Sequence, residues 1–415
     1  MDFSYSPRTQ AFRQRVGHFM EEYVLPYNGQ WHSEVAAGRF PLTLINDLKA
    51  LAHYEGLWNL FLPSLQEGQP GQALSNMEYA PVAEIMGRVP WASEVFNCSA
   101  PDSGNMELLQ LFANEEQSER WLNPLLAGEI RSCFAMSEPD VASSDATNMQ
   151  TSIRREGDEY VINGRKWFIS GLSHPNCRVA IVLGESDARS ESLHGRHSMV
   201  LVPLDTEGVE VVRDIPIMHH HSAEGHGELL FRNVRVPRSH LLGEEGAGFA
   251  MAQARLGPGR IHHCMRSIGQ CEVALELMRE RAVERRTFGK YLSEYANISD
   301  WIAHSRLEID QARLLVLQAA WQIDQHGAQA ARTAVAGIKV VVAQLQTRVL
   351  DRAMQVFGAM GLAPDTPLSF LWTWGRAMRV LDGPDEVHLR TVARQEYAQA
   401  REQLGQHSHF FTRQV

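Results

Sequence analysis

Apolar residues recur at helical spacing through the first third of the chain. Residues 12–26, 42–57 and 109–128 each place apolar side chains three or four positions apart, and the third segment ends in a glycine, Gly128. Strand-like alternation is nearly absent from this region. The pattern therefore predicts an N-terminal all-α domain over residues 1–130.

The period then changes to that of β-strands. Short runs rich in β-branched residues alternate with turn residues, and the dipeptides Gly157-Asp158 and Asn163-Gly164 are both typical of hairpin turns. Roughly six antiparallel strands fit into about 110 residues, which is a common size for a small all-β unit. We expect a middle antiparallel β-barrel or sandwich over residues 131–243.

Long apolar seams with helical steps return after the β region and predict a C-terminal four-helix bundle over residues 244–415. Pro384 suits the first turn of the fourth helix. The fold class is therefore α+β and multidomain, and seams of this length suggest an oligomer that buries bundle faces between subunits. The seams of the first three helices are Cys264, Ile268, Cys271, Leu275, Met278 and Ala282; Ile302, Ile309, Ala312, Val316, Ala319 and Ile323; and Val335, Ile338, Val342, Leu345 and Val349.

Composition narrows the class of protein. The 415 residues are 44% hydrophobic and 21% charged, which is ordinary for a globular protein. The net charge of −10 disfavours binding to nucleic acid. No apolar run is long enough to span a membrane, and the N-terminus lacks a signal peptide, so we expect a cytoplasmic protein. Five widely spaced cysteines without a Cys-x-x-Cys motif are expected to be buried, reduced thiols.

A run of histidines, His219 to His221 with His226, raises the possibility of a metal hydrolase. Adjacent histidines point in different directions and lack the helical spacing and the carboxylate of common metal sites. We therefore expect a loop of the β domain and no metal.

The strongest chemical signal opens the β region. Met136-Ser137-Glu138-Pro139 continues to Ser143-Ser144-Asp145. This string and the helical–β–helical order resemble the acyl-CoA dehydrogenase family over nearly the whole chain. The resemblance implies that Met136 and Ser137 bind the pyrimidine edge of FAD, and that Ser144 lies along the thioester arm of the acyl-CoA substrate. Donors fixed on a rigid loop would stabilise the negative charge that reduced flavin accumulates.

A second string, Lys166 to Gly171, is similar to the Trp-Ile-Thr segment of the family. The resemblance implies that Phe168 covers one face of the flavin and that the Ser170 hydroxyl bonds near N5, where hydride arrives. Phe168 stands where Trp is commoner, which keeps an apolar wall but loses an N–H donor.

The string Arg285-Arg286-Thr287-Phe288-Gly289-Lys290 resembles the Arg-x-Thr-Phe-Gly-Lys motif of the family. The resemblance implies that Arg285, Thr287 and Phe288 contact the flavin, with the arginine at the pyrophosphate of a neighbouring subunit. A guanidinium fork suits a pyrophosphate and keeps its charge when partly desolvated.

Residues 355–361 resemble the Gln-x-x-Gly-Gly-x-Gly turn of the family. The resemblance implies that Gln355 and Ala359 approach the ADP half of the dinucleotide, although Ala359 stands where a second glycine is usual. Flanking glycines would let the backbone come close to the cofactor.

Residues 379–388 carry the candidate catalytic base. Most of the family has Glu in a Tyr-Glu-Gly-Thr string here, whereas this chain has Asp382, which resembles a branch with Asp-Gly-Pro-Asp-Glu-Val-His. An aspartate is shorter by roughly 1.5 Å, so geometry has to compensate. We expect desolvation to raise its pKa when substrate is bound. The resemblance also implies that Gly383 and Arg260 contact substrate and that Asp385 contacts the cofactor.

The resemblance thus implies an FAD-dependent acyl-CoA dehydrogenase in which Asp382 removes the α-proton and a β-hydride leaves for flavin N5, giving a trans-2-enoyl-CoA. The implied partners are an electron-transfer flavoprotein and further copies of the chain, as a homodimer or homotetramer. Arg260, His262 and Arg266 could supply positive charge for the anionic substrate. Two alternatives stay open: a flavin oxidase of the nitroalkane or acyl-CoA oxidase type, and a catalytically silent relative that acts as a binding partner.

Overall fold

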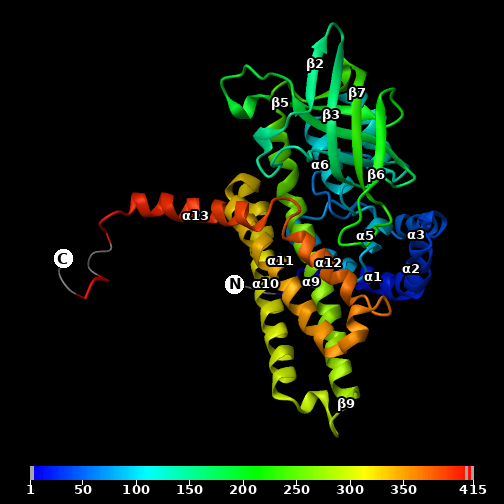
Figure 1. The fold of residues 1–415 in the computed structure, drawn as a ribbon, viewed down its shortest axis with the longest axis vertical. Helices are drawn as coiled ribbons and strands as arrows, with labels where there is room; N and C mark the ends of the chain where they lie inside the picture. The colour runs from blue at the N-terminus through cyan, green and yellow to red at the C-terminus, as the bar shows by residue number, and fades with distance from the viewer. Residues whose placement is uncertain (1–3, 407–409, 413–415) are drawn as a thin grey trace.

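The computed structural model describes residues 4–406 and 410–412 and shows the order of domains that the sequence predicts. Helices form the N-terminal part, a twisted sheet follows, and long helices form the C-terminal part (Figure 1). The predicted fold class, helical then β then helical, is therefore confirmed. Across the described residues, no helix is both long enough and apolar enough to cross a membrane.

Short helices build the N-terminal part, and local caps fix where several of them begin. The Ser6 side chain caps α1, and Ser75 with Glu78 forms a capping box at α4. The helices are α1 (Pro7–Phe19), α2 (Asn28–Ala36), α3 (Leu42–Tyr54), α4 (Asn76–Gly87), α5 (Ala92–Val95), α6 (Asp102–Phe112), α7 (Glu115–Gln117) and α8 (Asn123–Leu126), with a π-helical turn η1 (Met20–Val24) continuing α1.

The middle domain is one sheet with its own apolar core. Its path runs β6-β7-β3-β2-β4-β5-β8 and is mostly antiparallel, while β1 pairs in parallel with β4. The strands are β1 (Arg131–Ala135), β2 (Ser152–Glu156), β3 (Glu159–Ser170), β4 (Cys177–Glu185), β5 (His197–Pro203), β6 (Val209–Asp214), β7 (His226–Pro237) and β8 (Leu241–Leu242).

One of the two expected hairpin turns is present and the other is not. Gly157-Asp158 joins β2 to β3, as predicted. Asn163-Gly164 lies inside β3, where the pairing with β7 shifts register. The reason is steric, because a Cβ on Gly164 would come within 2.4 Å of the Thr151 hydroxyl. This glycine serves a close approach of the backbone to another segment.

The C-terminal part is built on three long helices whose predicted seams are buried, except that Ile302 and Ile323 are only partly buried. The helix α12 packs on α9 and α11 and completes the bundle. The elements are α9 (Gly248–Glu284), α10 (Ala296–Ala330), α11 (Arg332–Phe357), α12 (Leu368–Met378) and α13 (Asp385–Glu402), with a small hairpin of β9 (Arg286–Thr287) and β10 (Lys290–Tyr291) after α9.

The helix after Pro384, which the sequence assigned to the bundle as its fourth member, is α13. It packs against α11 near its start and then extends away from the bundle (Figure 1). Only Asp385 and His388 are buried on it. Since α13 lacks a continuous apolar face, it cannot fill a bundle position, and α12 takes that place.

All five cysteines are buried and free, as the sequence predicted. Burial raises the pKa of the Cys264 thiol to about 12, so this sulfur is protonated and unreactive at neutral pH. These residues act as small apolar side chains in the core.

Candidate active site

Asp382 lies in the tight turn between α12 and α13, and its backbone is held from two helices. Its φ is +51°, which is strained for a residue other than glycine. The Arg260 guanidinium on α9 donates to the Asp382 carbonyl oxygen from Nε at 3.2 Å and from Nη2 at 3.0 Å. His388 Nε2 on α13 lies 3.1 Å from the same oxygen. These contacts stabilise the strained turn and fix the position of the Asp382 Cα, from which the side chain extends.

Gly383 continues the same turn at φ +97°. A Cβ at this position would lie 2.9 Å from His388 Nε2, so a larger residue would displace the imidazole that supports the turn. Lys339, fully buried on α11, donates to the carbonyl oxygens of Met378 and Gly383. The structure thus gives Gly383 a conformational role, and its contact with substrate stays a prediction.

The Asp382 side chain is 27% exposed, so it is partly accessible from outside. Burial raises its pKa, but the nearby ring of His263 and the positive charges of Lys339, Arg260 and Arg255 lower it by more. The pKa therefore lies below the ordinary value, and the group is ionised at neutral pH. The rise expected with substrate bound stays a prediction.

The His263 side chain pairs with the carboxylate, with Nε2 3.5 Å from Oδ2 of Asp382. Burial and the charge of Arg266 lower its pKa to about 4, so the ring is neutral at pH 7. Arg266 Nη2 lies 3.3 Å from Nδ1. Because a guanidinium can only donate, Nδ1 is the acceptor and the ring proton sits on Nε2, facing Asp382. One feature of the sequence points to this residue, because it follows Arg260 by three positions and so lies on the same helix face.

The neighbouring histidine corrects an expectation. His262 is 1% exposed, lies between the rings of Phe61 and Tyr79, and has no hydrogen-bond partner for either ring nitrogen. Burial holds its pKa well below the ordinary value, so it is neutral. His262 therefore cannot supply positive charge for an anionic substrate.

A second carboxyl under the influence of Arg255, which the sequence did not indicate, belongs to Glu107. The charge of Arg255 on α9 acts on both Asp382 and Glu107. Its Nε donates to the Asn105 side chain at 2.9 Å, and its guanidinium lies 4.2 Å from the Phe134 ring centre. Glu107 is 8% exposed, neither of its carboxyl oxygens has a partner, and burial raises its pKa to about 8.

This shift predicts a pH-dependent stability that Glu107→Gln should remove. The folded chain keeps the Glu107 proton up to about pH 8, whereas the unfolded chain releases it near 4.5. Between these values the folded state binds more protons, so wild-type stability falls as pH rises and the loss is complete above about pH 8. The variant should match wild type below pH 4.5, and its advantage in stability should grow up to about pH 8 and stay constant above it. Urea unfolding across this range, with the exposed Glu119→Gln as control, measures the difference; parallel pH profiles for wild type and Glu107→Gln would contradict it.

The residues expected near the flavin ring lie together at the end of β3. Phe168 has φ +51° and is 42% exposed on a strand whose register with β7 is broken there. A bulky residue in this conformation is a true outlier and usually marks a functional site. Two residues on, Ser170 lies opposite His226 on β7, with its Oγ 3.0 Å from Nδ1.

The loop that carries Met136 and Ser137 is tied to β3. Lys166 Nζ donates to the Met136 carbonyl at 2.7 Å, and the Trp167 amide donates to the Ser137 carbonyl. These bonds place both residues beside the segment that holds Phe168. Further along the loop, the Ser143 hydroxyl is engaged by the Glu138 backbone, while Ser144 is exposed.

Five of the remaining predicted cofactor residues lie at the other end of the bundle (Figure 1). Arg285, Thr287 and Phe288 belong to or adjoin the β9–β10 hairpin, and the Phe288 ring is 97% exposed. Gln355 and Ala359 lie at the end of α11 and just after it, and both are exposed. The Arg281 guanidinium stacks on Phe357 and joins these two groups. A single chain therefore does not bring them to Phe168 and Ser170.

Asp385 begins α13 and is 3% exposed. Its Oδ2 pairs with Arg379 Nε at 2.8 Å and accepts from Gln344, while Oδ1 has no partner. The residue therefore stabilises the entry into α13, and its contact with a cofactor stays a prediction.

His219 to His221 occupy the loop between β6 and β7, as expected, whereas His226 is the first residue of β7. His221 lies 3.6 Å from Asp214, and His220 packs on Phe370 of α12. Within residues 4–406 and 410–412, no three His, Cys, Asp or Glu side chains group as metal ligands.

Known proteins resemble the chain from end to end. Family models of the acyl-CoA dehydrogenase N-terminal, middle and C-terminal domains match residues 6–129, 133–234 and 246–397. FadE2 of Mycobacterium tuberculosis, a probable acyl-CoA dehydrogenase, is 51% identical over 401 residues, which are 95% of this chain and 97% of that protein. Acyl-CoA dehydrogenase family member 11 of Gallus gallus is 48% identical over 95% of this chain, but the chain spans only 51% of its length.

Solved structures share the fold. Butyryl-CoA dehydrogenase from Megasphaera elsdenii matches with a TM-score of 0.81 and 26% identity over 96% of this chain and 100% of that chain. A structure of an electron transferring flavoprotein of Acidaminococcus fermentans matches with a TM-score of 0.82 and 25% identity, over 95% of this chain and 99% of that chain. With three family models and a relative of 51% identity over almost its full length, the chain belongs to the acyl-CoA dehydrogenase family.

Proposed function

We propose that the protein is an FAD-dependent acyl-CoA dehydrogenase that converts a saturated acyl-CoA to its trans-2-enoyl-CoA. Family membership supports an oxidoreductase of the dehydrogenase type. The observation that carries the proposal is the Asp382 turn, a strained backbone that holds a partly exposed, ionised carboxylate in a fixed position.

Asp382 is proposed to take the α-proton of the thioester. A carboxylate can act as a general base when it is ionised and within reach of the proton, and Arg260 and His388 fix the backbone from which it reaches. The Nε2–H of His263 faces Oδ2, which leaves Oδ1 free for the substrate. Ser144, exposed on its loop, is proposed to lie along the thioester arm, where Arg260 also contributes positive charge.

The residues of this chain fit FAD. An exposed aromatic ring at Phe168 and a hydroxyl at Ser170 suit a flavin ring, and Met136 and Ser137 lie on the loop bonded beside them. The exposed guanidinium of Arg285 forms no ion pair within the described residues and suits a pyrophosphate. When bound, FAD supplies the hydride acceptor for the β-carbon. Thr287, Phe288, Gln355, Ala359 and Asp385 are the other proposed cofactor contacts.

The separation of these residues supports a homo-oligomer, either a dimer or a tetramer. The ring-binding group is on β3, whereas Arg285 and Gln355 are at the opposite end of the bundle, so a dinucleotide could join them only between chains (Figure 1). The fully exposed Phe288 would then be covered by the partner.

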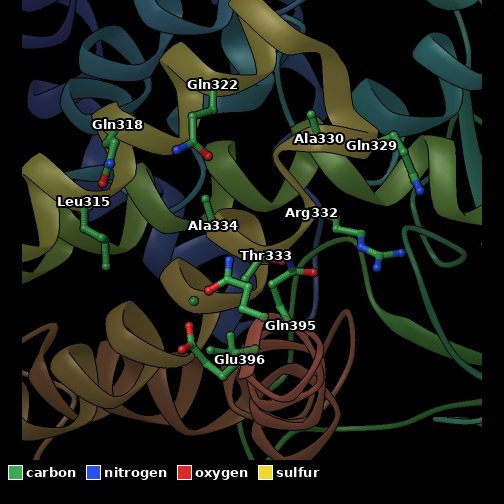
Figure 2. A pocket seen from close by; sticks show the side chains of 13 residues that line it. Leu315, Gln318, Gln322, Gln329, Ala330, Arg332, Thr333, Ala334, Gln395 and Glu396 are labelled. Carbon is green, nitrogen blue, oxygen red and sulfur yellow. The ribbon is translucent and has the colours of Figure 1, made fainter. Parts of the chain in front are cut away.

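A groove beside α13 supports the same proposal. It has a volume of about 710 Å³ and lies between α10, α11 and α13, where glutamines gather (Figure 2). The arm formed by α13 also exposes Leu389 and Tyr397, by 51% and 62%. We propose that a second copy of the chain covers this groove and the arm.

Anaerobic titration with acyl-CoAs tests the reaction. We expect the purified protein to have a flavin spectrum that a saturated acyl-CoA bleaches, with the enoyl-CoA as product. An electron-transfer flavoprotein is the proposed acceptor, so the reduced protein should regain colour quickly with it and slowly in air. Rapid recovery in air would instead support an oxidase. Protein purified without flavin would support a silent binding relative, and a flavin that no acyl-CoA in the panel bleaches would contradict the proposed reaction.

A further inference from the structure

His226 lies directly behind the hydroxyl proposed to meet the flavin. It is paired with Ser170 across β3 and β7, and its Nδ1 is 3.0 Å from the Ser170 Oγ. The backbone of His226 is fixed as well, because its amide donates to Oδ1 of Asp214 at 2.7 Å. His226 therefore fixes the position of the Ser170 hydroxyl.

The other ring nitrogen of His226 has no partner. The residue is 3% exposed, and Nε2 is buried without a hydrogen bond. The ring centre lies 5.4 Å from that of Trp374 on α12, in a tilted arrangement. A buried polar atom without a partner destabilises the folded state. The unpartnered Nε2 therefore points to a functional role of His226.

The ring is neutral at working pH. Burial lowers its pKa to about 4, while the Asp214 carboxylate opposes this shift. A neutral imidazole carries one proton, on Nδ1 or on Nε2. With the proton on Nε2, a buried N–H would lack an acceptor, and Nδ1 would take the only proton of the Ser170 hydroxyl. With the proton on Nδ1, that N–H is satisfied by the Ser170 oxygen, and the hydroxyl proton stays free.

We infer that His226 is a positioning residue: its Nδ1–H holds the oxygen of Ser170 and leaves the Ser170 hydroxyl to donate to the flavin. This inference rests on the proposed function, since it needs a flavin at Ser170. It adds a residue on a second strand, and through Trp374 it links the flavin-facing end of β3 to the helix that leads into the Asp382 turn.

Substitutions at His226 separate positioning from packing. Leu fills the space but cannot donate, whereas the side-chain N–H of Asn lies near the place of Nδ1–H. We expect His226→Leu to slow flavin bleaching roughly tenfold, as the loss of one oriented hydrogen bond would, and to shift the midpoint potential of the bound flavin. His226→Asn should restore most of both.

A double-mutant cycle with Ser170→Ala provides the decisive comparison. If His226 acts through Ser170, then His226→Leu should change neither the potential nor the rate further once the hydroxyl is gone. His197→Leu is the matched control, because His197 is also buried in this sheet with one unpartnered ring nitrogen. It should leave the potential unchanged.

Equal effects of His226→Leu with and without the Ser170 hydroxyl would overturn the inference, as would failure of His226→Asn to restore a shifted potential in a folded protein. The potential can be measured by dithionite titration without any acyl-CoA. A wild type that binds flavin but oxidises no acyl-CoA would thus reject the proposed reaction while His226 could still be tested. A wild type without flavin would overturn both.

Discussion

Replacing Asp382 with Asn should slow anaerobic flavin bleaching by an acyl-CoA about 10³-fold, within the range of 10² to 10⁴ that a general base contributes. Asn has nearly the same shape but cannot accept the α-proton. The bonds from Arg260 and His388 go to the backbone carbonyl, so the substitution leaves them in place. The variant should therefore fold and keep its flavin content, with only the modest loss of stability that follows from removing a charge whose pKa is lowered in the folded state.

Two further variants sharpen this test. Asp382→Glu keeps a carboxylate and should retain far more activity than the Asn variant, although its reach is longer by roughly 1.5 Å. Asp365→Asn, a substitution away from the turn, serves as the control for loss of one acidic side chain. A panel of acyl-CoAs that bleaches Asp382→Asn as fast as wild type would remove Asp382 as the base.

Replacing Arg131 with Met should destabilise the protein by about 3–5 kcal/mol, the usual cost of leaving buried charges without their partner. Arg131 is 2% exposed at the start of the sheet. Its guanidinium pairs with Glu94 at 2.8 Å, with Asp102, and with Glu224 at 3.6 Å. These carboxylates come from α5, from α6 and from the loop before β7, so one side chain joins the helical N-terminal part to the β domain.

An exposed arginine of the same sheet offers the matched control. Arg235 pairs with Glu156 at 2.8 Å and with Glu159 at 3.1 Å, but its side chain is 49% exposed. Arg235→Met should destabilise the protein far less than Arg131→Met, because water screens such exposed pairs. Urea unfolding followed by far-UV circular dichroism and by tryptophan fluorescence measures both variants. Similar losses for the two would show that the buried cluster holds the domains together no better than a surface pair does.

The order of domains and the helical seams could be predicted because they depend on local periodicity. Cys264 to Ala282 step by three and four and are buried on α9, as expected. The role of Asn163-Gly164 could not be predicted, because the glycine is required by the close approach of Thr151, a residue of another segment. The same applies to α13, whose place outside the bundle depends on α12 having the better apolar face.

The candidate site shows the same division. The resemblance directed attention to Asp382 and Arg260, and the structure brings them together over 122 residues of sequence. For His263 beside the carboxylate, only its spacing from Arg260 pointed to the site, and nothing indicated Lys339 under the turn or the unpaired Glu107. The environments of Lys339 and Glu107 are set by helices that meet only in three dimensions, so neither spacing nor composition reveals these two residues.

Arg260 and His388 both contact the main-chain carbonyl oxygen of Asp382. The position of the catalytic base is therefore supported independently of which side chain residue 382 carries. Neither of these two contacts depends on which side chain follows the Cα of residue 382. A lineage could therefore exchange one acidic residue for another here, and adjust its reach to a new acyl group, without first rebuilding the scaffold. Such a site can diverge in substrate preference through single substitutions.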